Sequence, residues 1–221
     1  MTLIVLLAAP TLLIFLGLQV MNSVPITFLL FYGWLFAVPF VDLMLVKRFT
    51  FSQTLRQLGF GLQRKSIVVG LVSGAIYFLA ILLAGSLFLP LLFEKAELER
   101  LLVEWKFSGE LFWWLVLVLV LVNPFLEELY WRGYFFYKAN GRFAQKKLIL
   151  LSSFFYSLYH LLSVVPLFAW PTPIIVIIAV FVAGVSWGIL RAKTGSLAGA
   201  VVSHIFADAG IILLYLLYLR S

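Results

Sequence analysis

Residues 111–136 read LFWWLVLVLVLVNPFLEELYWRGYFF, an apolar stretch that carries two glutamates and an arginine near its end. A helix needs about 20 mostly apolar residues to cross the hydrocarbon core of a bilayer, and this stretch is longer than that. Its apolar residues are continuous rather than alternating, which favours a membrane helix over a barrel strand. The stretch therefore predicts a spanning helix with charged groups inside the membrane.

Similar apolar stretches recur along the chain and predict an all-α, polytopic transmembrane helical bundle of about seven spans, within a range of six to eight. The expected spans are 3–21, 24–46, 67–93, 111–136, 148–170, 173–190 and 195–219. The first stretch has no Lys or Arg before it, which argues against a signal peptide. No internal repeat or polar linker divides the chain, so we expect residues 1–221 to form a single membrane domain.

The composition excludes several other classes of protein. Hydrophobic residues make up 64% and charged residues 11% of the 221 residues, and the mean hydropathy is +1.13. A soluble domain is typically about 45–50% apolar and about 25% charged, so a soluble enzyme or a disordered protein is excluded. Cysteine is absent, which excludes disulfides and thiolate metal sites. The net charge of +7 indicates positive loops at a membrane surface, and we expect no nucleic-acid partner.

The charges also predict the orientation in the membrane. Eleven of the 16 basic residues lie in the loops 47–66, 137–147 and 191–194, which contain no acid. A seven-span chain places these three loops on one side, and the positive-inside rule makes that side cytoplasmic. The N-terminus is then cytoplasmic as well. The short chain without a targeting signal favours the inner membrane of a bacterial-type cell.

The loop at 94–110 differs from the others because it is rich in acid. It contains Glu94, Glu97, Glu99, Glu104 and Glu110. Leu98, Leu101, Leu102 and Trp105 recur there at i, i+3, i+4 and i+7, a pattern typical of an amphipathic helix on a membrane surface. A solvated connector without a membrane contact is the alternative.

The remaining acids and both histidines fall within predicted spans. They are Asp42, Glu127, Glu128, His160, His204 and Asp208. Ionisable groups at membrane depth cost several kcal/mol unless they are paired, and they usually mark function. Asp42 lies near the end of its span beside Lys47 and Arg48, where we expect it to be paired or to extend toward the interface.

The two glutamates are expected to have different roles. Adjacent helical residues point about 100° apart, so Glu127 and Glu128 face different neighbours. Glu128 and Arg132 are separated by four residues and can form an ion pair, which is the structural interpretation of this motif. Glu127 has no cation nearby in the sequence and is suited to general acid–base chemistry. Pro124 is expected to disturb the helix just before the glutamates.

The histidines belong to two further pairs with helical spacing. Tyr156 and His160 share one face of the fifth span, and His204 and Asp208 share one face of the seventh. At about 1.5 Å rise per residue, Glu127 and these histidines and aspartate lie about 14–20 Å from the cytoplasmic ends of their spans. The four groups can therefore share one layer that opens toward the cytoplasm. The structural alternative is that each is a hydrogen-bonded core residue.

Together these motifs resemble the CPBP family, the CAAX prenyl endopeptidase and bacteriocin-processing proteins, also called the abortive-infection family. The family motif Glu-Glu-x-x-x-Arg matches Glu127 to Arg132, and His-x-x-x-Asn/Asp matches His204 to Asp208. The motif Phe-x-x-x-His matches Tyr156 to His160 with Tyr in place of Phe. The resemblance covers about residues 112–215, and the segments 58–62 and 195–197 are also similar.

The resemblance implies an intramembrane endopeptidase with an all-helical fold and a cavity open to the cytoplasm. Glu127 would be the general base and would activate the attacking water together with His160, while His204 and Asp208 would stabilise the oxyanion. Glu128, Arg132 and Tyr156 would support them. The substrate would be a hydrophobic or lipidated, CAAX-like peptide or a membrane-protein segment, reached within the lipid bilayer.

The aspartate at position 208 leaves the role of a metal open. An amide at this position donates to an oxyanion, whereas an ionised carboxylate repels it, so Asp208 must be protonated, ligate a metal or orient His204. Glutamate catalysis without a metal and zinc catalysis are the alternatives. Zinc would be held by Glu127, His160, His204 and Asp208. The zincin signature His-Glu-x-x-His is absent.

Two functions of other classes compete with peptide hydrolysis. A non-catalytic membrane protein for immunity or regulation could keep the same motifs as a structural polar core. A proton- or metal-coupled transporter also uses intramembrane Glu, His and Asp. Transporters often have repeated halves with matched broken helices, and this chain has only one polar helix interrupted by proline.

Overall fold

The computed structural model describes residues 2–92, 95–107 and 109–218, which form helices and no strand. The first half contains α1 (Leu3–Ile14), α2 (Val24–Phe40), α3 (Phe51–Leu58), α4 (Arg64–Leu92) and α5 (Lys95–Glu104). The second half contains α6 (Phe112–Leu117), α7 (Asn123–Glu128), α8 (Phe136–Ala139), α9 (Gln145–Leu158), α10 (Leu161–Leu167), α11 (Thr172–Thr194) and α12 (Ala198–Tyr218). A short 3-10 turn (Gly109–Leu111) precedes α6, and π-helical turns at Phe15–Val20, Val41–Val46, Val118–Val122 and Leu129–Phe135 extend or join several helices.

The number of spans agrees with the sequence. Six helical runs are long and apolar enough to cross a membrane: Leu3–Val20, Val24–Val46, Arg64–Phe88, Gly109–Ala139, Thr172–Thr194 and Ala198–Tyr218. The seventh is the pair α9 and α10, which is bent by 43° at a short break. The all-α polytopic bundle is thus confirmed. The expected span ends at residues 93 and 219 and the expected surface residue Glu94 lie outside the described residues.

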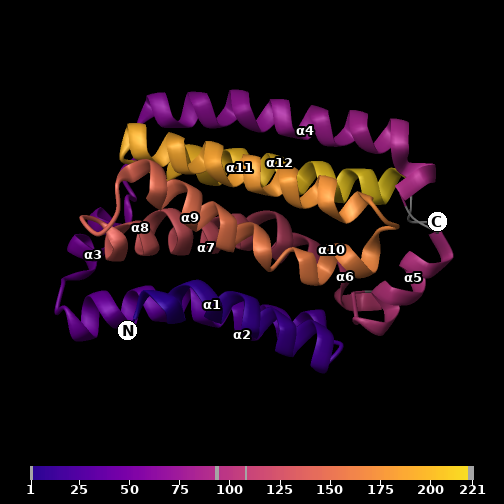
Figure 1. Ribbon diagram of the computed structural model, residues 1–221, viewed down its shortest axis with the longest axis horizontal. Helices are drawn as coiled ribbons and strands as arrows, with labels where there is room; N and C mark the ends of the chain where they lie inside the picture. Colours follow the sequence, from indigo (N-terminus) through magenta and orange to yellow (C-terminus); the bar gives the residue numbers. More distant parts are fainter. Residues whose placement is uncertain (1, 93–94, 108, 219–221) are drawn as a thin grey trace.

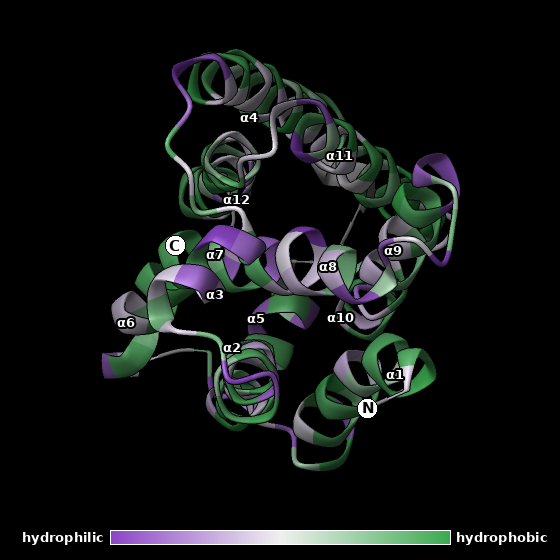
Figure 2. Cartoon of the chain, turned by 90° about the vertical axis from the view of Figure 1, so that its left-hand side faces the viewer, coloured by the Kyte–Doolittle hydropathy of each residue, from purple (hydrophilic) through white to green (hydrophobic). Residues whose placement is uncertain are grey.

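The spans run side by side along the long axis of the molecule (Figure 1). The helix α4 packs against α12, and both helices approach through glycines: a Cβ added at Gly70 would lie 2.3 Å from the carbonyl oxygen of Gly199. Moving apolar surface from lipid into a protein interior gives little free energy, so membrane helices depend on close packing for their association. Small residues such as glycine allow that close approach. The outward faces are apolar, with 77% of Ile4 and 75% of Leu29 exposed, and Figure 2 shows hydrophobic residues along most helix sides. Lipid is the solvent that suits such faces.

Two prolines within the spans create hydrogen bonds between helices. Pro10 has no N–H, so the carbonyl of Leu6 loses its helical donor, and it accepts instead from the hydroxyl of Tyr130 at 2.8 Å. Pro166 frees the carbonyl of Leu162 in the same way, and the side-chain amide of Gln19 donates to it at 2.6 Å. Unpaired backbone groups are costly in a membrane, so these bonds tie the first span to the fourth and fifth.

Pro124 has a milder effect than expected. The helical run continues from Gly109 to Ala139 without a break, and Pro124 lies directly after a π-helical turn, at the start of α7. The turns on both sides of α7 are π-helical instead. Such turns change the rotational setting of the following residues and often occur at functional sites.

The two ends of the bundle differ in charge, as expected. The helices α3 and α8, next to the basic loops, lie at the left end of Figure 1, and α5 lies at the right end. The predicted amphipathic helix is α5: Leu98 and Trp105 are buried, while Arg100 pairs with Glu97 and Glu104 on its exposed face. Asp42 pairs with Lys138 at 3.0 Å rather than with Lys47 or Arg48.

Candidate active site

The predicted site residues come from three parts of the bundle that meet in its interior. The glutamates lie on α7, His204 and Asp208 lie on α12, and His160 lies at the break between α9 and α10. Glu127 is 2% exposed, His204 2% and Asp208 9%. Three carboxylates and a histidine thus occupy a protein interior that is surrounded by lipid-facing helices, which is costly unless each group has partners.

Glu128 and Arg132 form the ion pair that the sequence predicts. Nη1 of Arg132 donates to Oε1 of Glu128 at 2.9 Å, and both side chains are fully buried. Nη2 donates to the carbonyl of Gly184 on α11 at 2.8 Å, and the guanidinium lies 4.5 Å from the ring centre of Tyr156. Because a Cβ at Gly184 would lie 2.9 Å from Nη2, the guanidinium needs glycine at that position. The pair therefore anchors α7 to α11 and α9.

Glu128 also orients His204. The Nδ1 atom of His204 lies 3.2 Å from Oε1 of Glu128 and donates its hydrogen there, because an ionised carboxylate only accepts. The ring stacks on Trp187 with 4.1 Å between the ring centres and 18° between the planes. Trp187 is held in turn by a hydrogen bond from Nε1 to the hydroxyl of Ser203. The direction of the Nε2 atom of His204 is thus fixed by Glu128 and Trp187.

Glu127 has one oxygen bound and one oxygen available. Its Oε1 accepts from the hydroxyl of Tyr159 at 2.8 Å. Its Oε2 is buried and has no hydrogen-bond partner among the described residues, and it lies 3.5 Å from Nε2 of His204. An unsatisfied buried carboxylate oxygen is rare and requires an explanation such as a catalytic role or a bound water.

The space next to Nε2 of His204 is bordered by three oxygens. They belong to Tyr156 at 3.4 Å, Glu127 at 3.5 Å and Asp208 at 3.7 Å. All three distances exceed the 2.7–3.2 Å of a good hydrogen bond. Catalytic hydrogen bonds in unliganded enzymes are often long and shorten when the substrate is bound. Nε2 of His204 and the three oxygens therefore form one buried polar cluster between α7, α9 and α12.

Asp208 has partners that the sequence did not indicate. Nδ2 of Asn123 donates to Oδ2 of Asp208 at 3.0 Å, and the hydroxyl of Tyr32 donates to Oδ1 of Asn123 at 3.1 Å. Neither Asn123 nor Tyr32 is among the site residues expected from the sequence, although Asn123 lies close to Glu127 along the chain. Its position one turn before Glu127 was a usable signal, whereas nothing in the second span singled out Tyr32.

His160 is near this group but does not join it directly. Its Nδ1 bonds to the carbonyl of Tyr156 at 2.9 Å, which leaves Nε2 as an acceptor, and its ring stacks on Tyr159 with 4.6 Å between the centres. In the described part of the chain no hydrogen bond or ion pair connects His160 with Glu127 or Asp208. Tyr159, which contacts both Glu127 and His160, is the link that sequence reasoning missed.

The side chains as placed do not fit the zinc ligand set considered above. Within residues 2–92, 95–107 and 109–218, no three His, Asp or Glu side chains are arranged as a metal site. A zinc site needs at least three protein ligands around one point. His160 stands apart, Nδ1 of His204 is engaged with Glu128, and one oxygen of Asp208 is engaged with Asn123.

Comparison with known proteins agrees with this assembly of motifs. Residues 109–210, which contain Glu127, His160 and Asp208, match the family model described as Rce1-like, type II CAAX prenyl endopeptidase. Neither the curated proteins nor the solved structures gave a match to the chain. Six candidate spans make it an integral membrane protein. Over residues 109–210 the chain is therefore similar to the CAAX-type membrane proteases of the CPBP family.

Proposed function

We propose that the protein is an intramembrane endopeptidase that hydrolyses peptide bonds in hydrophobic or lipidated, CAAX-like substrates. The observation that carries the proposal is the buried Oε2 of Glu127, which has no hydrogen-bond partner in the described chain and lies 3.5 Å from His204. A carboxylate held by one oxygen and open at the other suits a general base for water.

In the proposed reaction Glu127 takes a proton from water, and the hydroxide adds to the carbonyl carbon of the scissile bond. The carbon–nitrogen bond then breaks, and the proton passes from Glu127 to the leaving amine. Tyr159 holds the carboxylate in place through its 2.8 Å hydrogen bond. Nε2 of His160 can accept the second hydrogen of the same water, because Nδ1 is occupied by the carbonyl of Tyr156.

His204 is proposed to stabilise the oxyanion. Its Nε2 points into the space between Glu127, Asp208 and Tyr156. A proton on this nitrogen can be donated to the developing charge. Asp208 is proposed to orient His204 rather than to contact the oxyanion, since a carboxylate would repel it. Its bond to Asn123 keeps one of its oxygens away from His204.

The reaction is proposed to proceed without a metal. His204 is hydrogen-bonded to Glu128 and Asp208 to Asn123, and the described His, Asp and Glu side chains form no group of three that could hold a metal ion. The end with the basic loops is proposed to face the cytoplasm by the positive-inside rule, in a bacterial-type inner membrane. Peptides would then reach the site from the bilayer or from that side.

Cleavage of fluorogenic peptides by the protein in liposomes tests the proposal. The library contains hydrophobic peptides and farnesylated CAAX peptides. Glu127→Gln is compared with the wild type and with Glu104→Gln, the same change on the exposed face of α5. We expect cleavage by the wild type and Glu104→Gln and background rates for Glu127→Gln. Equal cleavage by Glu127→Gln would contradict the assignment of the base. Folded wild type without activity on any peptide would favour the immunity or regulatory function.

A further inference from the structure

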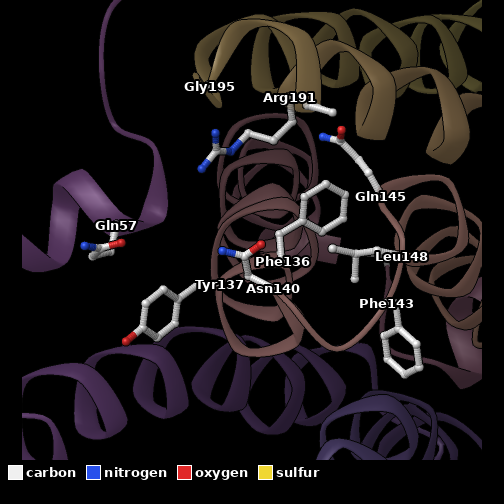
Figure 3. A pocket seen from close by; sticks show the side chains of 10 residues that line it. Gln57, Phe136, Tyr137, Asn140, Phe143, Gln145, Leu148, Arg191 and Gly195 are labelled. Atoms are coloured by element: carbon white, nitrogen blue, oxygen red, sulfur yellow. The ribbon is translucent and has the colours of Figure 1, made fainter.

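A cavity with a partly polar lining lies at the end of the bundle that carries the basic loops. Its volume is about 410 Å³, and it is separate from the buried site described above. Its lining includes Gln57 on α3, Tyr137 on α8, Asn140 directly after α8, Gln145 at the start of α9, and Arg191 near the end of α11 (Figure 3). A cavity of this size is within the usual range for small-molecule sites, about 300–1,000 Å³.

The lining is made from all three basic loops. Gln57 belongs to the loop 47–66, Asn140 and Gln145 belong to 137–147, and Arg191 belongs to 191–194. Of the lining residues only Arg191 is charged, and the other basic residues of the three loops lie at the same end of the bundle. The one acid at this end of the described chain, Asp42, is engaged with Lys138. A concentration of positive charge of this kind attracts anions.

Arg191 is held so that its charged group is presented to the cavity. Its Nε donates to the backbone carbonyl of Arg132 at 3.2 Å. Its guanidinium rests against Gly59, where a Cβ would lie 2.6 Å from Cζ, and the positive φ of +92° also favours glycine there. No carboxylate pairs with Arg191 in the part of the chain that the structure describes. Figure 3 shows its guanidinium extending over the side of the cavity where Gln57 lies.

The remaining polar groups of the lining are donors of the kind that phosphate oxygens accept. The amides of Gln57, Asn140 and Gln145 can each donate two hydrogens, and the planar guanidinium of Arg191 can bind phosphate through two parallel bonds. Phe136 and Tyr137 supply an apolar wall. Basic pockets between membrane helices at the polar end of the spans commonly bind lipid headgroups.

We propose that this cavity binds the phosphate headgroup of an anionic membrane phospholipid. The site lies where the spans end and the loops begin, at the depth where headgroups reside. Arg191 is the central ligand of the phosphate, and the side-chain amides complete the set of donors. The proposal is independent of peptide hydrolysis, because none of these residues belongs to the group around Glu127.

Lipid binding is measured by native mass spectrometry of the protein in detergent, with phosphatidylglycerol as the probe and phosphatidylcholine, a zwitterion without net charge, as the comparison. Arg191→Gln removes the central charge, and Lys193→Gln removes an exposed charge of the same helix that does not line the cavity. Gln145→Glu places a carboxylate in the lining and suits the first turn of α9, so this variant should fold.

We expect tight binding of phosphatidylglycerol to the wild type and Lys193→Gln, with affinity about tenfold lower for Arg191→Gln and for Gln145→Glu. Equal binding by Gln145→Glu and the wild type would overturn the proposal, whether or not Arg191→Gln folds. An equal loss in Lys193→Gln would also overturn it, because the binding would then follow overall surface charge. Glycerol 3-phosphate is added in a separate arm. Its binding with no preference for phosphatidylglycerol over phosphatidylcholine would assign the cavity to a soluble phosphate and overturn the lipid assignment.

Discussion

Nδ2 of Asn123 lies 3.0 Å from Oδ2 of Asp208, and this bond joins the helix that carries Glu127 to the helix that carries His204. The family motif allows Asn or Asp at position 208, and here an aspartate is paired with an asparagine from another span. The amide donor that the aspartate lacks is therefore present in the same group, supplied from one turn before Glu127.

This pairing predicts opposite results for two isosteric changes. Asp208→Asn keeps a hydrogen bond to Asn123, because its side-chain oxygen still accepts, and it should retain kcat/KM within about tenfold of the wild type. Asn123→Asp places two carboxylates at 3.0 Å, where both cannot ionise, and should lower kcat/KM by about 100-fold. Peptide cleavage in liposomes measures both. Equal activity of the two variants would contradict the proposed role of the pair.

Tyr159 should influence the chemical step more than substrate binding. Tyr159→Phe removes the hydroxyl that donates to Glu127 at 2.8 Å while keeping the ring that stacks on His160. A hydrogen bond to a charged group contributes about 1.5–3 kcal/mol, so kcat should fall about tenfold or more with little change in KM. Tyr218→Phe, at the exposed end of α12, is the matched control. A rise in KM at constant kcat would assign Tyr159 to substrate binding instead.

The buried pair of Glu128 and Arg132 should stabilise the fold only as a pair. Arg132→Met leaves Glu128 uncompensated in the interior and should lower the free energy of unfolding by about 3–5 kcal/mol. Adding Glu128→Gln should restore part of that loss, since no buried charge is then left without a partner. Unfolding in detergent, followed by circular dichroism, compares Arg132→Met, Glu128→Gln and the double variant. Additive losses would show that the two side chains do not act together.

Gly184 offers a test of the packing around the same guanidinium. A Cβ there would lie 2.9 Å from Nη2 of Arg132 and 3.2 Å from Cδ1 of Tyr156, so Gly184→Ala should destabilise the protein by about 1–3 kcal/mol. Gly33→Ala is the matched control, because a Cβ at Gly33 meets nothing within 4 Å. The control should be neutral or stabilising by up to about 1 kcal/mol, as alanine favours helix. Equal stability of the two variants would contradict the close contact.

Removal of metal should leave activity unchanged. His204 and Asp208 are engaged with Glu128 and Asn123 rather than arranged around a common point. We expect cleavage to survive dialysis against a chelator and the purified protein to contain less than one equivalent of zinc by elemental analysis. Loss of activity that stoichiometric zinc restores would contradict the metal-free mechanism and require the side chains to rearrange.

Much of this protein follows from local features of the chain. Span positions follow from apolar length, because a bilayer requires about 20 apolar residues whatever the neighbouring helices do. The pair of Glu128 and Arg132 and the shared face of His204 and Asp208 follow from the helical repeat alone. The surface helix α5 follows from its apolar periodicity, and the gathering of basic loops at one end follows from counting spans.

The contacts between spans could not be derived in this way, because an apolar span carries no local signal for the neighbour that it faces. Lys138 rather than Lys47 reaches Asp42, and Tyr159 rather than His160 bonds to Glu127. The bend of 43° after α9, which places Tyr159 and His160 side by side, also had no clear sequence signal. These contacts depend on how each helix is rotated, crossed and bent. Rotation, crossing and bending result from the packing of all seven spans together. The carboxylates and the histidine stand out in the sequence because ionisable groups are energetically costly in a membrane. Their hydrogen-bond partners depend on how the helices pack and are visible only in the structure.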